Sequence, residues 1–284
     1  MVVNPSTKLR IKTAILPVAG LGTRVMPLTL HQAKGMIGIV DRPMVHYVID
    51  EIASAGVKHI VIVHGPNQKE FEAYVDYLEQ DPSWKKLNVK FDFVVQENPR
   101  GNGDAIYIAK NFVKNDPFLV CFGDDLLADK KPPLKTFLNL FAKVAAPMVM
   151  LEPVPKKLVS RYGVVRARKD ANQKDLYKIS DVVEKPKPED APSNLTIIGR
   201  YVLDKKTLDY VGKLYSNQKL GKDAILLAEA LKNYANDGHP LYGWHFRGRR
   251  FDGGSKIGIL KAQAYFGIHH KELGPEFRKF LSSI

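Results

Sequence analysis

Residues 14–24 read Ala-Ile-Leu-Pro-Val-Ala-Gly-Leu-Gly-Thr-Arg, and Lys34 follows ten residues later. The apolar run predicts a buried strand, and the glycine-rich turn behind it leaves unpaired backbone N–H groups at the carboxyl end of that strand. Glycine has no Cβ, so a phosphate can approach such N–H groups closely. Together with Arg24 and Lys34, this segment predicts a site for a polyphosphate substrate.

Two better-known phosphate motifs do not fit this segment. The dinucleotide-binding fingerprint requires a third glycine where this chain has Val25, and the P-loop requires a closing Gly-Lys-Ser/Thr that Thr23 and Arg24 do not supply. Gly20 and Gly22 taken alone also fit a tight turn without a ligand. The two cations that follow favour the phosphate interpretation.

The first half of the chain alternates apolar, β-branched runs with stretches of helical spacing. The predicted strands are 12–18, 59–64, 89–95, 117–122 and 147–151. The predicted helices are about 43–55, 67–79, 103–112 and 133–144. This alternation predicts an α/β fold with a Rossmann-like, mainly parallel (mixed) sheet flanked by helices. Because ligands bind outside the carboxyl ends of such strands, we expect the polar clusters at 20–24, 96–103 and 123–125 to share a site.

The second half predicts a smaller β lobe followed by C-terminal helices. Its predicted strands are 162–168, 176–184, 195–203 and 240–247, and its predicted helices are 221–236, 255–268 and 275–282. No linker or internal repeat separates the halves, so we expect a single domain over residues 1–284. Within it we expect a nucleotide-binding half at 12–152, a sugar-phosphate-binding half at 153–270 and a C-terminal helix in 271–284.

Composition excludes several classes of protein. Of the 284 residues, 45% are hydrophobic, which supports a sizeable core. The single cysteine, Cys121, lies in an apolar run, so an internal disulfide is impossible and burial is expected. The net charge is +13 with scattered basic residues, which indicates a cationic surface and no nucleic-acid partner. No signal peptide or long apolar run is visible, so we expect no membrane partner and a cytoplasmic location.

Two carboxylate positions resemble magnesium ligands. Asp124 and Asp125 end an apolar strand, and their side chains should point to opposite sides, so that one faces the site. Asp252 stands in a similar polar turn of the second half. Mg²⁺ prefers such oxygen ligands, although a turn or capping role fits each aspartate equally well. Glu184 and Lys185 match a sugar hydroxyl and a phosphate, and they also fit an ordinary surface pair.

Read in chain order, these segments resemble the sugar-1-phosphate nucleotidylyltransferases, and most closely the bacterial UTP–glucose-1-phosphate uridylyltransferase family. The resemblance covers about residues 12–280. The diagnostic segments are 17–24, 40–44, 162–165, 183–187, 191–195 with 198–203, and 251–256.

The resemblance implies a transfer of the uridylyl group from UTP to glucose 1-phosphate, assisted by Mg²⁺, in a homo-dimer or homo-tetramer. The implied nucleotide-binding residues are Ala19, Gly20, Gly22, Gln96 and Gly101. The implied sugar-phosphate-binding residues are Gly163, Glu184, Lys185 and Asn194. The implied catalytic residues are Arg24, Lys34, Asp124 and Lys185, and the implied metal ligands are Asp124 and Asp252.

Three segments depart from the family pattern. The family's Gly-Leu-Gly-His reads Gly-Asn-Gly-Asp at 101–104, Gly35 stands in place of a glutamate, and 222–229 differs from the family's polar segment. Two alternatives therefore stay open. One is a related enzyme that uses dTTP or another sugar 1-phosphate, and the other is an inactive paralogue that binds nucleotide or partner subunits.

Overall fold

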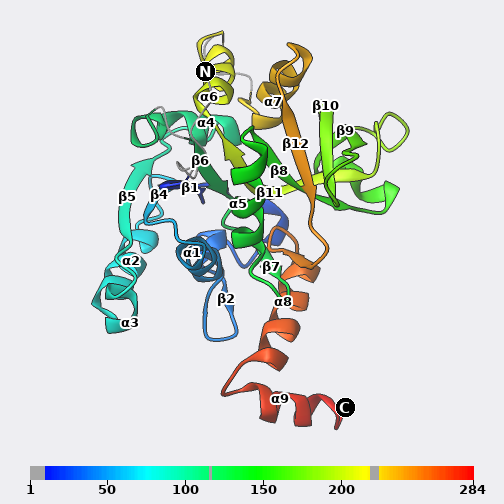
Figure 1. Ribbon diagram of the computed structural model, residues 1–284. Coiled ribbons are helices and arrows are strands. Elements are labelled where there is room, and N and C mark those ends of the chain that lie inside the picture. Colours follow the sequence, from blue (N-terminus) through cyan, green and yellow to red (C-terminus); the bar gives the residue numbers. More distant parts are fainter. Residues whose placement is uncertain (1–9, 115–116, 218–223) are drawn as a thin grey trace.

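A computed structural model of the chain describes residues 10–114, 117–217 and 224–284 (Figure 1). The strands of its central sheet are β1 Thr13–Pro17, β4 His59–His64, β5 Lys90–Val95, β6 Phe118–Cys121, β8 Met148–Pro153, β9 Gly163–Lys169, β10 Leu176–Glu184, β11 Leu195–Leu203 and β12 Leu241–His245. Within the described residues they form one nine-stranded sheet in the order β5-β4-β1-β6-β11-β8-β12-β10-β9.

Helices and short ribbons surround this sheet. The α-helices are α1 Met44–Ser54, α2 Glu70–Gln80, α3 Pro82–Lys85, α4 Asn102–Ile108, α5 Pro133–Val144, α6 Lys205–Ser216, α7 Leu227–Asn236, α8 Lys256–His269 and α9 Gly274–Leu281. The 3-10 helices are η1 Thr23–Val25, η2 Lys34–Met36, η3 Lys110–Phe112 and η4 Lys156–Arg161. Two small antiparallel ribbons pair β2 Gly38–Ile39 with β3 Arg42–Pro43 and β7 Asp125–Ala128 with β13 Arg249–Asp252.

The first part of the sheet is parallel, and its strands β1, β4 and β6 are buried on both faces. β1 pairs in parallel with β4 and β6, and β4 pairs in parallel with β5. Side chains alternate across such a strand. Leu16 packs into the core that α1, α2 and α5 cover, and Ile15 packs into the core that α4, α6 and α7 cover. Burial on both faces explains why these strands are continuous apolar runs.

The second half of the chain completes the same sheet. β11 lies between β6 and β8 and is antiparallel to both, while β12 is parallel to β8. β9 and β10 form an antiparallel pair at the far edge, which Figure 1 shows as the yellow-green lobe opposite β5. The sheet is therefore mixed, as the sequence predicts, and its antiparallel part belongs to the second half.

The predicted elements match the structure closely, with a few exceptions. The helix predicted over 221–236 begins only at Leu227, because the backbone of Ile225 bonds to the loop at 100–103 instead of to a helical turn; residues 221–223 lie outside the described part of the chain. The sequence interpretation also missed helices α3 and α6 and the short strands β2, β3, β7 and β13. α6 begins at a capping box in which Asp204 and Thr207 exchange side-chain-to-backbone hydrogen bonds, a signal that is readable in the sequence.

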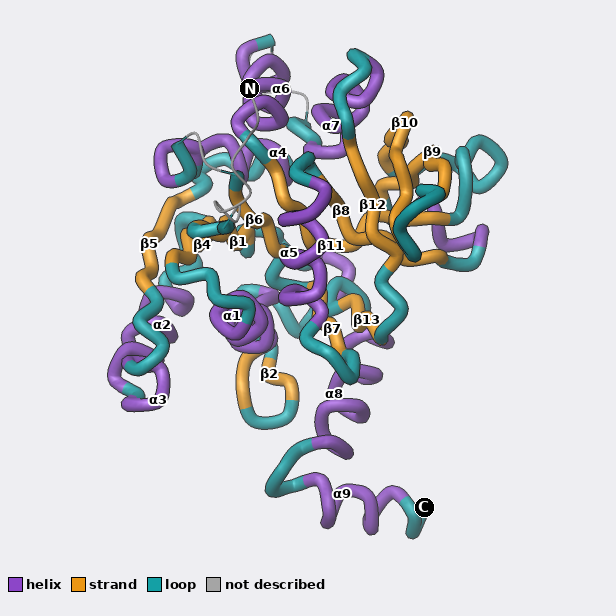
Figure 2. Tube along the Cα trace, viewed as in Figure 1, coloured by secondary structure: helices purple, strands orange, loops and turns teal. Residues whose placement is uncertain are grey.

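The C-terminal helices project from the body of the molecule. Figures 1 and 2 show α8 leading away from the sheet and α9 turning across its end. Among the residues that the structure describes, no helix combines the length and the apolar character needed to cross a membrane.

Candidate active site

Two adjacent cavities open along the carboxyl ends of the parallel strands. The smaller cavity, about 390 Å³, is lined by the glycine turn after β1, by Lys34 and by the loop after β5. The larger cavity, about 800 Å³, is lined by residues of β9–β11, β13 and the start of α8. Asn102, Phe122 and Asp124 line both cavities. The polar clusters that the sequence predicted to meet at this edge therefore do meet, and the two cavities share a wall.

The glycine turn forms one side of the smaller cavity. Ala19, Gly20 and Gly22 all line it, so the structure brings these three predicted residues together. Gly22 has a φ of +62°, and a Cβ at this position would lie 2.8 Å from Cγ2 of Thr29. The Thr29 hydroxyl also donates to the Gly22 carbonyl at 3.0 Å. The positive φ and the close contact of a Cβ make glycine necessary for the fold of this turn.

Lys34 and Asp124 form an ion pair on the shared wall. The Lys34 ammonium donates to Oδ2 of Asp124, and their side chains are 17% and 24% exposed. Burial raises the pKa of the Asp124 carboxyl, but the Lys34 ammonium and the Arg250 guanidinium outweigh it, so the pKa lies below its usual range. An ionised carboxylate and a lysine thus face the junction of the two cavities.

Arg24 lies on the other side of the shared wall from the glycine turn. It lines the larger cavity, together with Asp252 and Gly254, and does not line the smaller one. A Cβ on Gly254 would lie 2.5 Å from Nη2 of Arg24, 2.9 Å from Oδ1 of Asp252 and 3.4 Å from Oδ2 of Asp124. Gly254 therefore lets one cation and two carboxylates approach the same point.

The ribbon of β7 and β13 brings the two candidate metal ligands together. Asp252 pairs with Asp125 in this ribbon, and Gly253 N–H donates to the Asp124 carbonyl at 2.8 Å. Both aspartates line the larger cavity, but Asp125 is only 5% exposed and its carboxylate is held by Gly199 and Arg250. Asp124 alone of the two also lines the smaller cavity, so its carboxylate is the one at the junction.

The donor set suits a magnesium ion and does not suit zinc. Within the described ranges, no cluster of three or more His, Cys, Asp or Glu side chains is placed to hold a metal. Mg²⁺ commonly takes only one or two protein carboxylates, because its other positions are filled by water and substrate phosphate. Asp124 and Asp252, close to one point beside Gly254, match that requirement.

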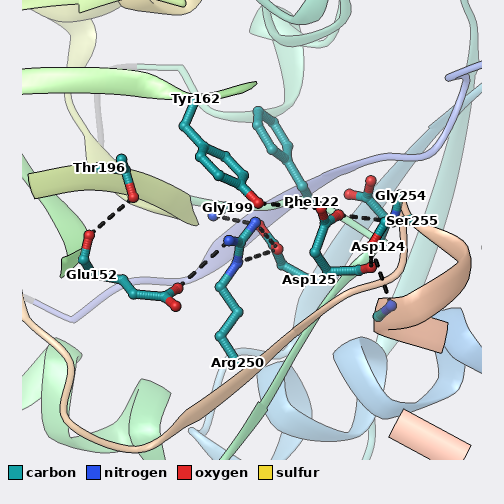
Figure 3. A network of polar contacts seen from close by, with 12 residues as sticks. Phe122, Asp124, Asp125, Glu152, Tyr162, Thr196, Gly199, Arg250, Gly254 and Ser255 are labelled. Carbon is teal, nitrogen blue, oxygen red and sulfur yellow. Dashed lines mark hydrogen bonds and ion pairs between the residues drawn. The ribbon is translucent and has the colours of Figure 1, made fainter. Parts of the chain in front are cut away.

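A buried guanidinium organises the floor of the larger cavity (Figure 3). Arg250 donates from Nε to Asp125 at 2.6 Å, its Nη1 lies 3.5 Å from Glu152, and its guanidinium lies over the ring of Tyr162 at 4.9 Å. The Tyr162 hydroxyl donates to Oδ2 of Asp252 at 3.3 Å. Burial lowers the pKa of Arg250, but Asp125 and Glu152 raise it by more, so this side chain stays charged. The network links β7, β8 and β13 with Tyr162, the residue before β9, around the candidate metal ligands.

The predicted sugar-phosphate residues divide into two groups. Gly163, Glu184 and Lys185 line the larger cavity, where Glu184 pairs with Gly163 across β9 and β10 and Lys185 Nζ lies 3.3 Å from Oε1 of Glu184. Asn194 is exposed and lines neither cavity. The Asn194 carbonyl accepts from the N–H of Val154, and the assignment of its side chain to the sugar stays a prediction.

Gln96 and Gly101 lie together in the smaller cavity, as predicted. Gln96 is 4% exposed, and its amide nitrogen donates to the Gly101 carbonyl at 3.1 Å. The same nitrogen donates to Oδ2 of Asp104 at 2.6 Å. The amide is thus fixed at the end of β5, beside the glycine turn.

Sequence reasoning missed Asn102, Tyr162 and Arg250 as members of the site. A signal exists for Arg250, because it stands two residues before Asp252 on a strand and alternation places both side chains on one face. No local pattern identifies Asn102, since its position on the shared wall depends on α7: its Oδ1 accepts from the N–H of Leu227 at 2.9 Å.

Comparisons with known proteins agree with this geometry. A sequence profile of the family described as "Nucleotidyl transferase" matches residues 13–266. A UTP–glucose-1-phosphate uridylyltransferase of Staphylococcus haemolyticus is 33% identical over 291 residues, which covers 97% of this chain and 99% of the relative.

Two solved structures have the same architecture. A UTP-bound UDP-glucose pyrophosphorylase (UGPase) from Acinetobacter baumannii superimposes with a TM-score of 0.82 at 32% identity, covering 97% of this chain and 100% of the other. A UDP-glucose pyrophosphorylase complexed with UDP-glucose superimposes with a TM-score of 0.81 at 33% identity, covering 90% of this chain and 98% of the other.

Proposed function

Since the chain belongs to the nucleotidyl transferase family, we propose that it transfers the uridylyl group of UTP to glucose 1-phosphate, forming UDP-glucose and pyrophosphate. The observation that carries the proposal is the pair of cavities that share Asn102, Phe122 and Asp124. One cavity has the glycine turn of a nucleotide site, and the other has the acidic and basic side chains that a sugar phosphate needs. The relatives that bind UTP and UDP-glucose support this division.

The reaction requires charge neutralisation more than proton transfer. An oxygen of the sugar phosphate forms a bond to the α-phosphorus of UTP, and the bond from that phosphorus to the bridging β-oxygen breaks. The leaving pyrophosphate keeps the electron pair. The nucleophile is already an anion, so a general base is not required. Lys34 on the shared wall, with Arg24 and Lys185 in the larger cavity, supplies positive charge where the two anions meet.

We propose that Asp124 and Asp252 hold Mg²⁺ during this reaction. The proposal is supported by the approach of both carboxylates to Gly254 and by the lowered pKa of Asp124. When bound, the ion would neutralise phosphate charge at the junction of the cavities. Tyr162 and Arg250 would keep the two ligands in place, because Tyr162 bonds to Asp252 and Arg250 bonds to the neighbour of Asp124.

Pyrophosphate release tests the proposed function directly. The four common nucleoside triphosphates and dTTP are each combined with glucose, galactose and N-acetylglucosamine 1-phosphates, with and without Mg²⁺. The expected result is fastest release with UTP, glucose 1-phosphate and Mg²⁺ together. Fastest release with dTTP or another sugar would instead support the related-enzyme alternative. UTP binding without turnover in any combination would support the inactive paralogue.

We also propose that the chain self-associates through its projecting C-terminal helices and acts in the cytoplasm. Leu260, Leu273 and Phe280 on this arm are 63%, 45% and 55% exposed, and exposed apolar groups of this size mark interaction surfaces. Sedimentation equilibrium should give a dimer or tetramer, and L260E/F280E should shift it toward monomer. An unchanged molar mass in that variant would contradict the assignment of the surface.

The proposed cytoplasmic location is supported by the chemistry of the substrates. Both proposed substrates are charged phosphates that do not cross membranes unaided, which favours the compartment in which nucleotides are made. Fractionation of cells tests this location.

A further inference from the structure

The amide of Gln96 can have only one orientation in this structure. One end of it meets two groups that accept hydrogen bonds, the Gly101 carbonyl and the Asp104 carboxylate. Neither group can donate: the Gly101 carbonyl has no hydrogen, and the Asp104 carboxylate accepts in an ion pair with Arg100. The end that faces them must therefore be the amide nitrogen, whose two hydrogens are both used.

The oxygen of the same amide is left for a ligand. No residue in the described part of the chain donates a hydrogen bond to Oε1 of Gln96, and Gln96 lines the smaller cavity beside the glycine turn. This oxygen is not among the buried side-chain atoms that lack a partner, so it is accessible from the cavity and free to accept a hydrogen bond from a ligand. Gln96 thus presents an acceptor, and not a donor, to whatever fills the cavity.

Asp104 is held firmly enough to impose this orientation. It is 1% exposed, and Nη2 of Arg100 donates to its Oδ1 at 2.7 Å. The guanidinium of Arg100 lies 4.6 Å from the ring centroid of Tyr215. The backbone that leads into Asp104 is fixed as well, because Ile225 donates to the Arg100 carbonyl at 2.6 Å and accepts from the Gly103 N–H at 2.9 Å.

We propose that Asp104 is a positioning residue that makes the site selective for a pyrimidine with an N–H at its Watson–Crick edge. The proposal rests on the proposed function and names the chemistry of its base selection. Uracil and thymine carry a hydrogen on N3, which can be donated to Oε1 of Gln96. Cytosine carries a lone pair at N3, which would face the Gln96 oxygen, acceptor against acceptor. Asp104 thereby favours UTP and dTTP over CTP.

Equilibrium binding of UTP and CTP to the full chain, measured by calorimetry, tests this selectivity without chemistry. We expect Asp104→Asn to lower the ratio of UTP affinity to CTP affinity at least about tenfold, because the asparagine amide can turn and allow Gln96 to turn with it. Arg100→Met removes only the support of Asp104 and should lower the ratio less. Asp209→Asn is a control for the loss of an ion pair with the same spacing, since Asp209 accepts from Lys205, four residues earlier, at an exposed position outside both cavities.

A double-mutant cycle separates positioning from a general loss of structure. Gln96→Met removes the amide, so Asp104→Asn should change the ratio no further in that background. The proposal would be overturned if the ratio of UTP affinity to CTP affinity were the same in the unmodified chain, in Asp104→Asn and in Arg100→Met. It would also be overturned if Asp104→Asn lowered this ratio as much in the Gln96→Met background as it does alone. These outcomes concern binding alone, so they stand whether or not UTP and glucose 1-phosphate react. Loss of pyrophosphate release with an intact binding ratio would instead count against the proposed function.

Discussion

The two cavities are built in different ways. The smaller cavity is formed by loops that directly follow parallel strands, and its contacts come largely from the glycine turn and the Gln96 loop. The larger cavity is formed where antiparallel strands from distant parts of the chain meet, and a buried cation, Arg250, joins their carboxylates. Parallel strands place successive loops at one edge automatically. The larger cavity instead depends on charges whose burial is tolerated only when they are paired.

The largest effect should come from breaking the buried pair beneath the larger cavity. In Asp125→Ala, Arg250 keeps its charge but loses its main partner, and the Gly199 N–H loses its acceptor. We expect a loss of about 3–5 kcal/mol in the free energy of unfolding. Urea unfolding measures it.

Asp209→Ala provides the comparison for that change, because it removes an exposed ion pair on α6. Its effect on the unfolding midpoint should be small. Equal losses in the two variants would show that the Arg250 network does not stabilise the larger cavity.

The next effect concerns the wall that the cavities share. Asp124→Asn removes the charge that faces both cavities, so turnover should fall about 100- to 1,000-fold. The KM values for the two substrates should change much less than kcat. Pyrophosphate release measures both, and Asp129→Asn, at an exposed position beyond β7, is the control. Near-normal turnover would remove Asp124 from the proposed metal site.

A third change should separate the cavities by substrate. Lys185→Ala removes a cation from the larger cavity only, so the KM for glucose 1-phosphate should rise about tenfold or more while the KM for UTP changes little. Lys187→Ala, an exposed lysine outside both cavities, should change neither. A rise in the KM for UTP alone would reverse the assignment of substrates to cavities.

The smallest effect lies in the scaffold that supports the smaller cavity. His46 is 7% exposed on α1, and burial, followed by the charge of Arg42, lowers its pKa from 6.5. The unfolded chain therefore binds a proton at a higher pH than folded His46 does. The contribution of His46 to the free energy of unfolding is complete above about pH 6.5, the pKa of the unfolded state. It is lost as the pH falls from there through the lowered pKa of the folded state.

Replacement of that group tests the assignment. Urea unfolding at about pH 7.5 and about pH 5.5 should show a smaller loss of stability on acidification in His46→Gln than in the unmodified chain. An equal loss in both would assign the acid sensitivity to other groups. Turnover at about pH 7.5 should be close to normal, because His46 lines neither cavity.

The sequence predicted the smaller cavity better than the larger one. The turn at 20–24, Lys34 and Gln96 are local signals at strand ends, and the structure brings them to one edge. Arg24 belongs to the same motif but lines the larger cavity, because the backbone turns through η1 after Gly22. Asn194 is exposed and lines neither cavity, so its assignment to the sugar stays a prediction.

The sequence by itself determined the order of strands and helices, the mixed sheet and the glycine turn, because alternation of apolar residues and the need for glycine are properties of short segments. It also determined which side chains are available for phosphate and metal. Only the tertiary structure decided that Asp124 and not Asp125 reaches both cavities, that Arg250 links the ligands, and that Asp104 orients Gln96. These depend on contacts between segments far apart in the chain, and the free energy of burying a charge or an amide is set by the partners that folding places around it.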